Sequence, residues 1–342
     1  MSTAAGVGAA VVLAALAALP YVDLAGPVPL LQALAPIGGV VLVAAAFALA
    51  TALAVAAVAI RSARRRAGIA RLGAAALACL VAGGAMLWPV LPPVVESGGS
   101  TGSPPGDATS LSVLSLNTEY GQADPTTIVE QVRHRRVDLL VLLEETPQHW
   151  AALQEAGLSE LLPHVTGSVG SDAGGSIIAS AHPLTCPDSP GGRCDVTTRG
   201  ERRGSGTAFD QPVAQLADGT LVRAAHPWPP RPDPARWRRE QHEMGLWLQG
   251  HAHRPLVVAG DFNAGPVHPV FRAVTAGFDR SPRHGLPWVR TWPMSVPGLG
   301  DVPPFVQIDH IVAGGRVCVE DSVVRVPGTD HAAVWARLDP LP

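Results

Sequence analysis

Three short clusters near the C-terminus combine Asp, Asn and His, which are residue types suited to chemistry on phosphate esters. They are GDFN (260–263), IDH (308–310) and TDH (329–331), and each closes or follows a short apolar run. Hydrolysis of a phosphate ester needs a divalent ion to neutralise phosphate oxygens, a base to activate water and donors for the transition state. Since Mg²⁺ prefers carboxylate and amide oxygens, these clusters indicate metal-assisted hydrolysis.

Further polar residues follow apolar runs earlier in the chain. Asn117 comes after 111–116, Glu144 after 137–143 and His226 after 221–225. The full candidate set is Asn117, Glu144, His226, Asp261, Asn263, Asp309, Asp330 and His331. Taken singly, each has an ordinary explanation, such as a turn residue, a helix cap for Glu144 or Glu145, or a buried hydrogen-bonded histidine. Their ordered combination at successive strand ends favours one shared site.

Alternating strand and helix patterns predict the elements that position these residues. Strands are predicted over 111–116, 137–143, 176–180, 220–225, 256–259, 308–313 and 334–338, and helices over 124–136, from Pro147, over 234–250 and from Pro266. The 234–250 segment is amphipathic, with Arg236, Arg238 and Arg239 on a solvated face or, alternatively, gripping phosphate. The spacing indicates a layered α/β or α+β domain.

The first hundred residues have a different composition from the rest of the chain. The chain has 342 residues, 15% of them charged, and its formal net charge is −3, so no global basic field argues for nucleic acid binding. Three segments, 1–22, 24–60 and 72–95, contain no charged side chain, and each is long enough to cross a bilayer, which takes roughly 20 residues. We therefore expect three transmembrane helices within residues 1–95.

Charge placement predicts how these helices are oriented. The connection between the second and third spans is rich in arginine, with Arg61, Arg64, Arg65, Arg66 and Arg71. Because positively charged loops stay in the cytoplasm, the N-terminus should be cytoplasmic and everything after the third span extracytoplasmic. The expected location is the cell membrane, as a multi-pass protein.

A Gly-, Ser- and Pro-rich stretch at 96–109 is predicted to be a flexible linker, which leaves 110–342 as the soluble domain. Cys186 and Cys194 bracket a Pro- and Gly-rich stretch in that domain. They are expected either to close a small disulfide loop outside the reducing cytosol or to remain free thiols.

The soluble domain resembles the endonuclease/exonuclease/phosphatase superfamily, the group related to DNase I. The resemblance extends from about Ser110 to Leu338 and is strongest at 137–144, GDFN, IDH and TDH. It implies a four-layer α/β sandwich in which two mixed β-sheets face each other, helices cover the outside, and the site lies at one end. It also implies a divalent cofactor, Mg²⁺ or Mn²⁺.

The resemblance assigns a role to each candidate. Glu144 would be the principal metal ligand with Asn117 beside it, and Asp330 a second metal-side carboxylate. Asp261 would activate water, Asn263 would hold a phosphate oxygen, Asp309 would orient His331, and His331 would contact the scissile phosphate. His226 matches the family's other histidine, on the leaving-group side.

The sequence departs from the family pattern at two positions. Leu143 stands where Gln often precedes the metal-binding Glu, and His310 stands where nucleases frequently have Arg. No carboxylate can be assigned as the partner of His226, and Glu201 has little to support it. These departures leave the metal centre intact and put DNA in doubt as the substrate.

The sequence therefore predicts an outward-facing, membrane-anchored phosphoesterase that acts on nucleic acid, a phospholipid head group or a small phosphoester. A lipid phosphodiesterase of the sphingomyelinase type is the alternative enzyme. A non-catalytic membrane receptor with the same fold is less favoured, and a transporter is disfavoured because the spans lack charged residues. The expected partners are the substrate and the lipid bilayer, with no obligate protein partner evident.

Overall fold

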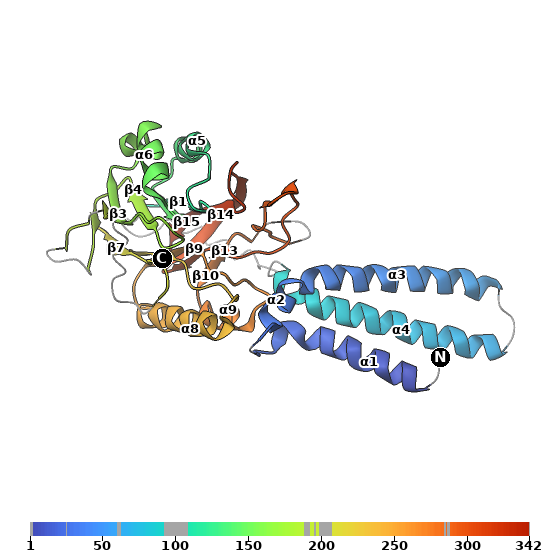
Figure 1. Cartoon of the computed structure of the whole chain (residues 1–342). Helices are drawn as coiled ribbons and strands as arrows, with labels where there is room; N and C mark the ends of the chain where they lie inside the picture. Colours follow the sequence, from blue (N-terminus) through green and yellow to red (C-terminus); the bar gives the residue numbers. More distant parts are fainter. Residues whose placement is uncertain are drawn as a thin grey trace. The chain divides into compact units, whose positions relative to one another are not determined.

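The computed structural model describes residues 3–24, 26–59, 63–91, 109–187, 192–194, 196–197, 207–283, 285 and 288–341. The chain divides into two compact units (Figure 1). One contains the N-terminal helices up to Leu91, and the other contains the sheets. Residues 96–108 of the predicted linker, Glu201, and the centre of the predicted Arg-rich connection (60–62) lie outside the described residues.

The N-terminal unit is helical. It contains α1 (Thr3–Ala18), α2 (Val28–Ala33), α3 (Ala35–Ala59) and α4 (Ala63–Leu87), with 3₁₀ turns at Leu19–Tyr21 and Trp88–Val90. Helices α3 and α4 approach closely at Gly39 and Gly83, where a Cβ on Gly83 would lie 2.7 Å from the Gly39 carbonyl oxygen. Small residues at a helix crossing let the two backbones pack against each other.

Two of these helices are long and apolar enough to cross a membrane, over Ala35–Val55 and Gly68–Val90. The first predicted span, 1–22, corresponds to a shorter apolar helix over Gly6–Tyr21. The structure thus supports two spans by length and composition, and the count of three stays a prediction. The second predicted span was also too long at its start, because residues 24–34 contain the separate short helix α2.

The other unit is built on two mixed sheets. The first has the strand order β14-β15-β1-β2-β4-β3-β6, and the second has β10-β13-β9-β8-β7-β5. The strands of the first sheet are β1 (Leu111–Asn117), β2 (Leu139–Leu143), β3 (His164–Ser168), β4 (Ser176–Ser180), β6 (Val196–Thr197), β14 (Arg316–Arg325) and β15 (Ala332–Pro340). Those of the second are β5 (Leu184–Thr185), β7 (Val213–Leu216), β8 (Leu221–Ala225), β9 (Leu256–Asp261), β10 (Asp279–Ser281) and β13 (Asp309–Gly314). A separate hairpin pairs β11 (Ser295–Val296) with β12 (Gly300–Asp301).

Helices cover the outer faces of both sheets (Figure 1). One apolar cluster lies between the sheets and includes Val141 from β2 and Val257 from β9. A second cluster lies under α5 (Pro125–Arg135), α6 (Pro147–Glu155) and α7 (Leu158–Leu161). A third lies under α8 (Pro234–Gly250) and α9 (Pro269–Val274). The order of layers is therefore helix, sheet, sheet, helix, and the expected sandwich of two mixed sheets flanked by helices is confirmed.

Most predicted elements are present, with differences at some boundaries and several elements that were not predicted. The strand predicted to end at Ala259 continues to Asp261, because Gly260 stays paired with both Ala225 and His310. The helix predicted to begin at Pro266 begins instead at Pro269, so that prediction was wrong by three residues. Strand β14, ten residues long, was not predicted, and neither were the shorter strands β3, β7 and β10.

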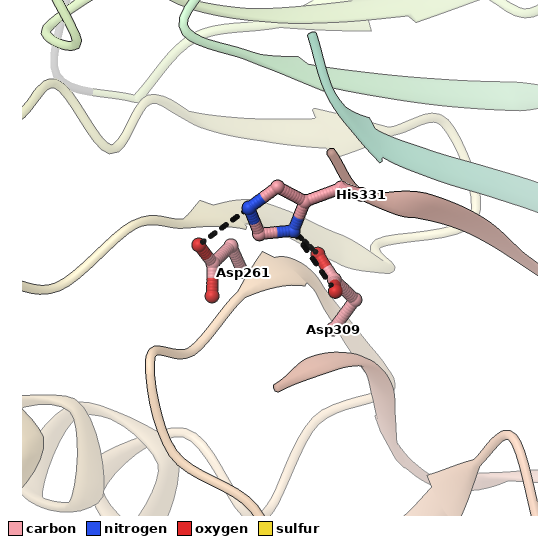
Figure 2. Close-up of side chains that lie close together, drawn as sticks. All are labelled: Asp261, Asp309 and His331. Atoms are coloured by element: carbon pink, nitrogen blue, oxygen red, sulfur yellow. Dashed lines mark hydrogen bonds and ion pairs between the residues drawn. The ribbon is translucent and has the colours of Figure 1, made fainter. Parts of the chain in front are cut away.

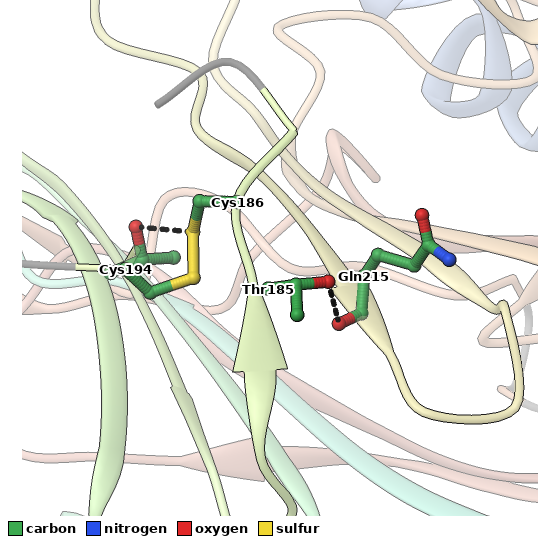
Figure 3. Close-up of a disulfide and its surroundings, with 5 residues drawn as sticks. Thr185, Cys186, Cys194 and Gln215 are labelled. Carbon is green, nitrogen blue, oxygen red and sulfur yellow. Dashed lines mark hydrogen bonds between the residues drawn. A yellow bond between two sulfur atoms is a disulfide. The ribbon is translucent and has the colours of Figure 1, made fainter. Parts of the chain in front are cut away.

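A disulfide joins Cys186 and Cys194 (Figure 3). Cys186 directly follows β5, at one edge of the second sheet, and Cys194 precedes β6, at one edge of the first. The bond therefore ties together edges of the two sheets. Close by, the Thr185 hydroxyl donates to the Gln215 carbonyl oxygen, 3.3 Å away, between β5 and β7.

Candidate active site

Parallel pairing brings the ends of two pairs of strands to one end of the sandwich. In the first sheet, Asn117 of β1 lies opposite Leu143 of β2, so Glu144 is the next residue along. In the second sheet, Ala225 of β8 lies opposite Gly260 of β9. His226 and Asp261 are therefore the next residues on these two strands.

Antiparallel pairing adds the C-terminal clusters to the same end. Asp309 is the first residue of β13 and lies opposite Asp261. His331 immediately precedes β15, which pairs with β1. The approach of β8 and β9 requires Gly260, since a Cβ there would lie 2.1 Å from the Ala225 carbonyl oxygen.

Figure 2 shows the His331 ring between two carboxylates. Its Nδ1 lies 3.0 and 3.1 Å from the two oxygens of Asp309, and its Nε2 lies 3.8 Å from Oδ2 of Asp261. Burial lowers the pKa of His331, but the Asp309 carboxylate outweighs it and, with Asp261 and Asp330, raises that pKa to about 10. The imidazole is thus held in its protonated form with Nε2 directed at Asp261.

Glu144 and Asn117 lie next to this trio. The Asn117 Nδ2 donates to Oε1 of Glu144 at 3.1 Å and approaches Oδ2 of Asp261 at 3.4 Å. The Asn117 oxygen accepts from the Glu119 backbone N–H at 3.0 Å. Asn117 therefore connects the carboxylates of the two sheets in this structure, and its role as a metal ligand stays a prediction.

Asp330 faces the same space from the segment before β15. Its Oδ1 lies 3.7 Å from Nε2 of His331, and its Oδ2 accepts from the Trp292 indole N–H at 2.8 Å. Its backbone N–H donates to the Glu119 carboxylate at 2.6 Å. Glu119 was absent from the predicted set, although its place two residues after Asn117 was a usable signal.

His226 lies beside Glu144 and beneath an aromatic ring. Its Nε2 is 3.7 Å from Oε1 of Glu144, which makes Glu144 the nearby carboxylate that the sequence did not reveal. The Phe209 ring stacks on it with centroids 4.4 Å apart. Burial, together with the charge on His331, lowers the pKa of His226 to about 3, so this imidazole is neutral at pH 7.

Asn263 turns the chain next to Asp261. Its backbone N–H donates to Oδ1 of Asp261 at 2.7 Å, and its side-chain Nδ2 donates to the Pro227 carbonyl oxygen at 3.0 Å. This second bond ties the segment after β9 to the segment after β8. Asn263 is therefore placed at the site, with one amide hydrogen already used to hold the neighbouring loop.

Two residues of the predicted motifs lie away from the site. His310 is buried against Phe271, with ring centroids 4.3 Å apart, and its Nε2 lies 3.1 Å from the Ala264 carbonyl oxygen. Leu143 is fully buried between the sheets. At these two departures from the family pattern, the chain has core residues.

Glu144 and Glu145 point to different partners, and neither caps the next helix. The cap of α6 is Thr146, whose hydroxyl accepts from the His149 backbone N–H. Glu145 is fully buried, and both of its oxygens lie about 3 Å from Nδ1 of His149. The helix-cap explanation of these two acids is therefore wrong.

The site holds more carboxylates than cations. Burial is the main cause of a raised pKa at Glu144 and Glu119, and it raises the pKa of Asp261 to about 7. Within the described residues, the ion pairs of these carboxylates are made by histidines and not by arginine. Clustered, desolvated carboxylate oxygens are the donor set of a hard divalent ion, so the residues present fit Mg²⁺ or Mn²⁺.

A family comparison agrees with this geometry. The profile of the Endonuclease/Exonuclease/phosphatase family matches residues 114–331, which is more than half of the chain. The chain belongs to the endonuclease/exonuclease/phosphatase family. The matched range of this family member runs from β1 to His331 and contains every predicted site residue.

Solved structures with a similar fold share little sequence with this family member. A Bacteroides thetaiotaomicron endonuclease/exonuclease/phosphatase family protein is 15% identical, with 69% of this chain and 100% of that chain covered and a TM-score of 0.48. A humanized D. rerio TDP2 is 13% identical, with 67% and 99% covered and a TM-score of 0.49. Sphingomyelinase C from Streptomyces griseocarneus is 16% identical, with 67% and 99% covered and a TM-score of 0.43. A search of curated proteins gave no match.

The ligand atoms of Asp261, Asp309 and His331 lie within 4.8 Å of one another, close enough to surround an ion. Both oxygens of Asp309, however, already face Nδ1 of His331. Ligation by Nδ1 would require this hydrogen-bonded pair to separate. We therefore expect a divalent ion on the Glu144 and Asp330 side, where the carboxylates are more exposed.

Replacing Asp309 by Asn should lower the pKa of His331. The carboxylate stabilises the protonated imidazole, and each unit of pKa corresponds to about 1.4 kcal/mol. In the metal-free protein, ¹⁵N-histidine NMR should place the titration midpoint of His331 near 10, and Asp309→Asn should move it down by at least about one unit. An unchanged midpoint would show that Asp309 does not hold the proton.

Divalent ions should stabilise the protein more strongly as the pH rises. Asp261 has a folded pKa of about 7, above its unfolded value, so metal-free stability falls as the pH rises from about 4 to 7. A bound cation favours the ionised carboxylates and offsets that loss. The rise in melting temperature on adding Mn²⁺ should be larger at pH 8 than at pH 5.5. Equal rises at both pH values would contradict this coupling.

Proposed function

We propose that this protein is a membrane-anchored, divalent-metal-dependent phosphoesterase that cleaves a phosphodiester or phosphomonoester by in-line attack of water. The observation that carries the proposal is the arrangement of Asp261 and the Asp309–His331 pair next to Glu144. This combination supplies a base, a cation and a metal-binding carboxylate within one buried cluster. The fold alone would not select this reaction, because one fold can host many activities.

In the proposed reaction, Asp261 is the general base. A carboxylate with a pKa of about 7 can take a proton from water at neutral pH, which a carboxylate of ordinary pKa does poorly. Its Oδ1 accepts from the Asn263 N–H, which fixes the direction of Oδ2, the oxygen that faces Asn117 and His331. Proton transfer from water to Asp261 would accompany attack on phosphorus. The phosphorus–oxygen bond to the leaving group would break, and the departing oxygen would take its proton from solvent.

The two histidines have different charges and different proposed roles. His331 is protonated through Asp309, so its Nε2–H would stabilise negative charge on the phosphoryl oxygens. His226 is neutral and lies beside Glu144, where it would donate a hydrogen bond without adding charge. Asn263 would hold a phosphate oxygen through its remaining amide hydrogen.

Glu144 and Asp330 would hold the divalent ion, with Asn117 beside them and Glu119 supporting Asp330. When bound, Mg²⁺ or Mn²⁺ would supply neutralisation of phosphate charge. The clusters GDFN, IDH and TDH contain no Ser or Cys that could act as a nucleophile, so water is the proposed nucleophile.

The proposed location is the cell membrane, with the catalytic domain on the extracytoplasmic side. Two apolar helices of spanning length support anchoring. The Arg-rich connection between them favours a cytoplasmic loop, and the Cys186–Cys194 disulfide suits an oxidising compartment. Substrates in reach would include extracellular nucleic acid, phospholipid head groups and small phosphoesters.

A lipid phosphodiesterase of the sphingomyelinase type is the second candidate. It is favoured by the two apolar helices, which would keep the site near a bilayer. A receptor without activity is disfavoured by the charge pattern, because buried carboxylates with raised pKa values are costly to retain in a purely structural role.

The activity test uses the full chain in detergent micelles with Mg²⁺ or Mn²⁺. Substrates would be bis-p-nitrophenyl phosphate, p-nitrophenyl phosphate, plasmid DNA and sphingomyelin. Asp261→Ala and His331→Ala should each lower kcat by at least about 100-fold, since they remove the base and the charge stabiliser. His253→Ala, which removes an exposed histidine, should have no effect.

The pattern of turnover would separate the candidates. Metal-dependent hydrolysis that both site variants abolish would support the phosphoesterase, and the preferred substrate would decide between the two enzymes. Folded, metal-binding protein that hydrolyses none of the four substrates would favour the receptor instead.

A further inference from the structure

Helix α8 presents polar groups on a buried face. Trp237, Glu240 and Gln241 occupy positions i, i+3 and i+4, which share one side of a helix. Their exposed fractions are 1%, 3% and 0%. Because burying a carboxylate is costly unless it is well paired, the partners of Glu240 indicate its purpose.

Glu240 accepts hydrogen bonds from three parts of the chain. Its Oε1 accepts from the Ala208 backbone N–H at 3.1 Å and from Nε of Arg236 at 2.8 Å. Its Oε2 accepts from the Trp228 backbone N–H at 2.8 Å. One carboxylate thus fastens the segment before β7 and the segment after β8 to the same helix.

The two fastened segments enclose His226. Phe209 follows Ala208 and stacks on the His226 ring, and it also stacks on Trp228 with centroids 5.4 Å apart. The Arg236 guanidinium lies 4.6 Å from the Trp228 ring centroid. Arg236 is therefore paired with Glu240 and Trp228 while its side chain stays 34% exposed, and the phosphate-gripping role considered from sequence stays a prediction.

The flanking residues of this face hold the neighbouring loop. The Trp237 indole N–H donates to the Asn263 carbonyl oxygen at 2.9 Å, and the Gln241 side chain donates to the Phe262 carbonyl oxygen. The same helix face thus contacts the backbone on both sides of the proposed site. Hydrogen bonds to backbone atoms fix a loop more firmly than apolar packing alone, because they are directional.

We propose that Glu240 is a positioning residue that holds His226 in place through Ala208, Phe209 and Trp228. The carboxylate has two oxygens for two backbone donors, and the stack it supports keeps the His226 imidazole beside Glu144. This inference rests on the proposed function for its effect on turnover. Its structural part, the placement of His226, is independent of any activity.

The test compares two identical substitutions on one helix, in the full chain in micelles. Glu240→Gln leaves a single oxygen and directs an NH₂ at one of the backbone donors, so one segment is released. Glu243→Gln makes the same change at an exposed position three residues further on. Glu240→Gln should lower kcat roughly 10- to 100-fold, and Glu243→Gln should leave it unchanged.

A double-mutant cycle separates positioning from general damage. Glu240 acts through His226, so Glu240→Gln should cost less than about threefold when His226→Ala is already present. Mn²⁺ affinity should stay at the wild-type value, because Glu144 and Asp330 lie on other segments. An undiminished loss in the His226→Ala background, or a kcat unchanged by Glu240→Gln, would overturn the proposal.

Histidine NMR gives a readout that needs no turnover. The ¹⁵N resonances of His226, assigned with His226→Ala, should shift in Glu240→Gln and stay in place in Glu243→Gln. If the wild type is inactive but this shift occurs, the proposed function fails and the positioning role stands. If Glu240→Gln does not fold, Phe209→Leu removes the ring on His226 and should give the same shift, and an unshifted His226 would overturn the proposal.

Discussion

The charge balance of the site is the constraint on which the rest of the structure depends. Five carboxylates, from Glu119, Glu144, Asp261, Asp309 and Asp330, converge at one end of the sandwich around a single protonated histidine. Desolvation raises the pKa of several of them, so they cannot all be ionised at low cost without a further cation. The geometry is therefore poised for a divalent ion, and Asp309 matters because it stabilises the positive charge on His331.

Four residues at or next to the site have left-handed backbone conformations. Glu119, Tyr120, Glu144 and Asn263 all have left-handed conformations, with φ between 49° and 57°. Non-glycine residues adopt this region at a cost on the order of 1 kcal/mol each, so the surroundings must hold them. Their supports are visible: the Thr118 hydroxyl donates to the Leu143 and Glu144 carbonyl oxygens, and α8 holds the Asn263 segment.

The sequence predicted the site best where a polar residue of a catalytic type stood at the end of a predicted strand. Each predicted site residue follows or opens a strand at the same end of the sandwich, because parallel β1 and β2, and parallel β8 and β9, end there. The sequence could not reveal which carboxylate faces His226, because Glu144 and His226 belong to different sheets and meet only through sheet packing. Glu240 was missed for a related reason, since the two donors that give it this positioning role are backbone N–H groups, which leave no side-chain signal.

The number and boundaries of the N-terminal helices were predicted less accurately than the strands of the sheets. Its first apolar stretch forms a helix shorter than the other two, and a short helix precedes the second. Composition alone cannot separate a spanning helix from a shorter apolar one, because Ala and Gly dominate both. In the sheets, by contrast, alternation and turn residues limit where a strand can end, and boundaries there were mostly predicted within two residues.

Mn²⁺ binding to the full chain, followed by electron paramagnetic resonance, tests the central claim most directly. The wild-type protein should bind Mn²⁺ with a specific signal, and Glu144→Gln should abolish or strongly weaken that binding while the melting temperature of the metal-free protein stays close to wild type. Equal binding by Glu144→Gln, or no specific binding by the wild type, would contradict the assignment of this carboxylate cluster as a metal centre.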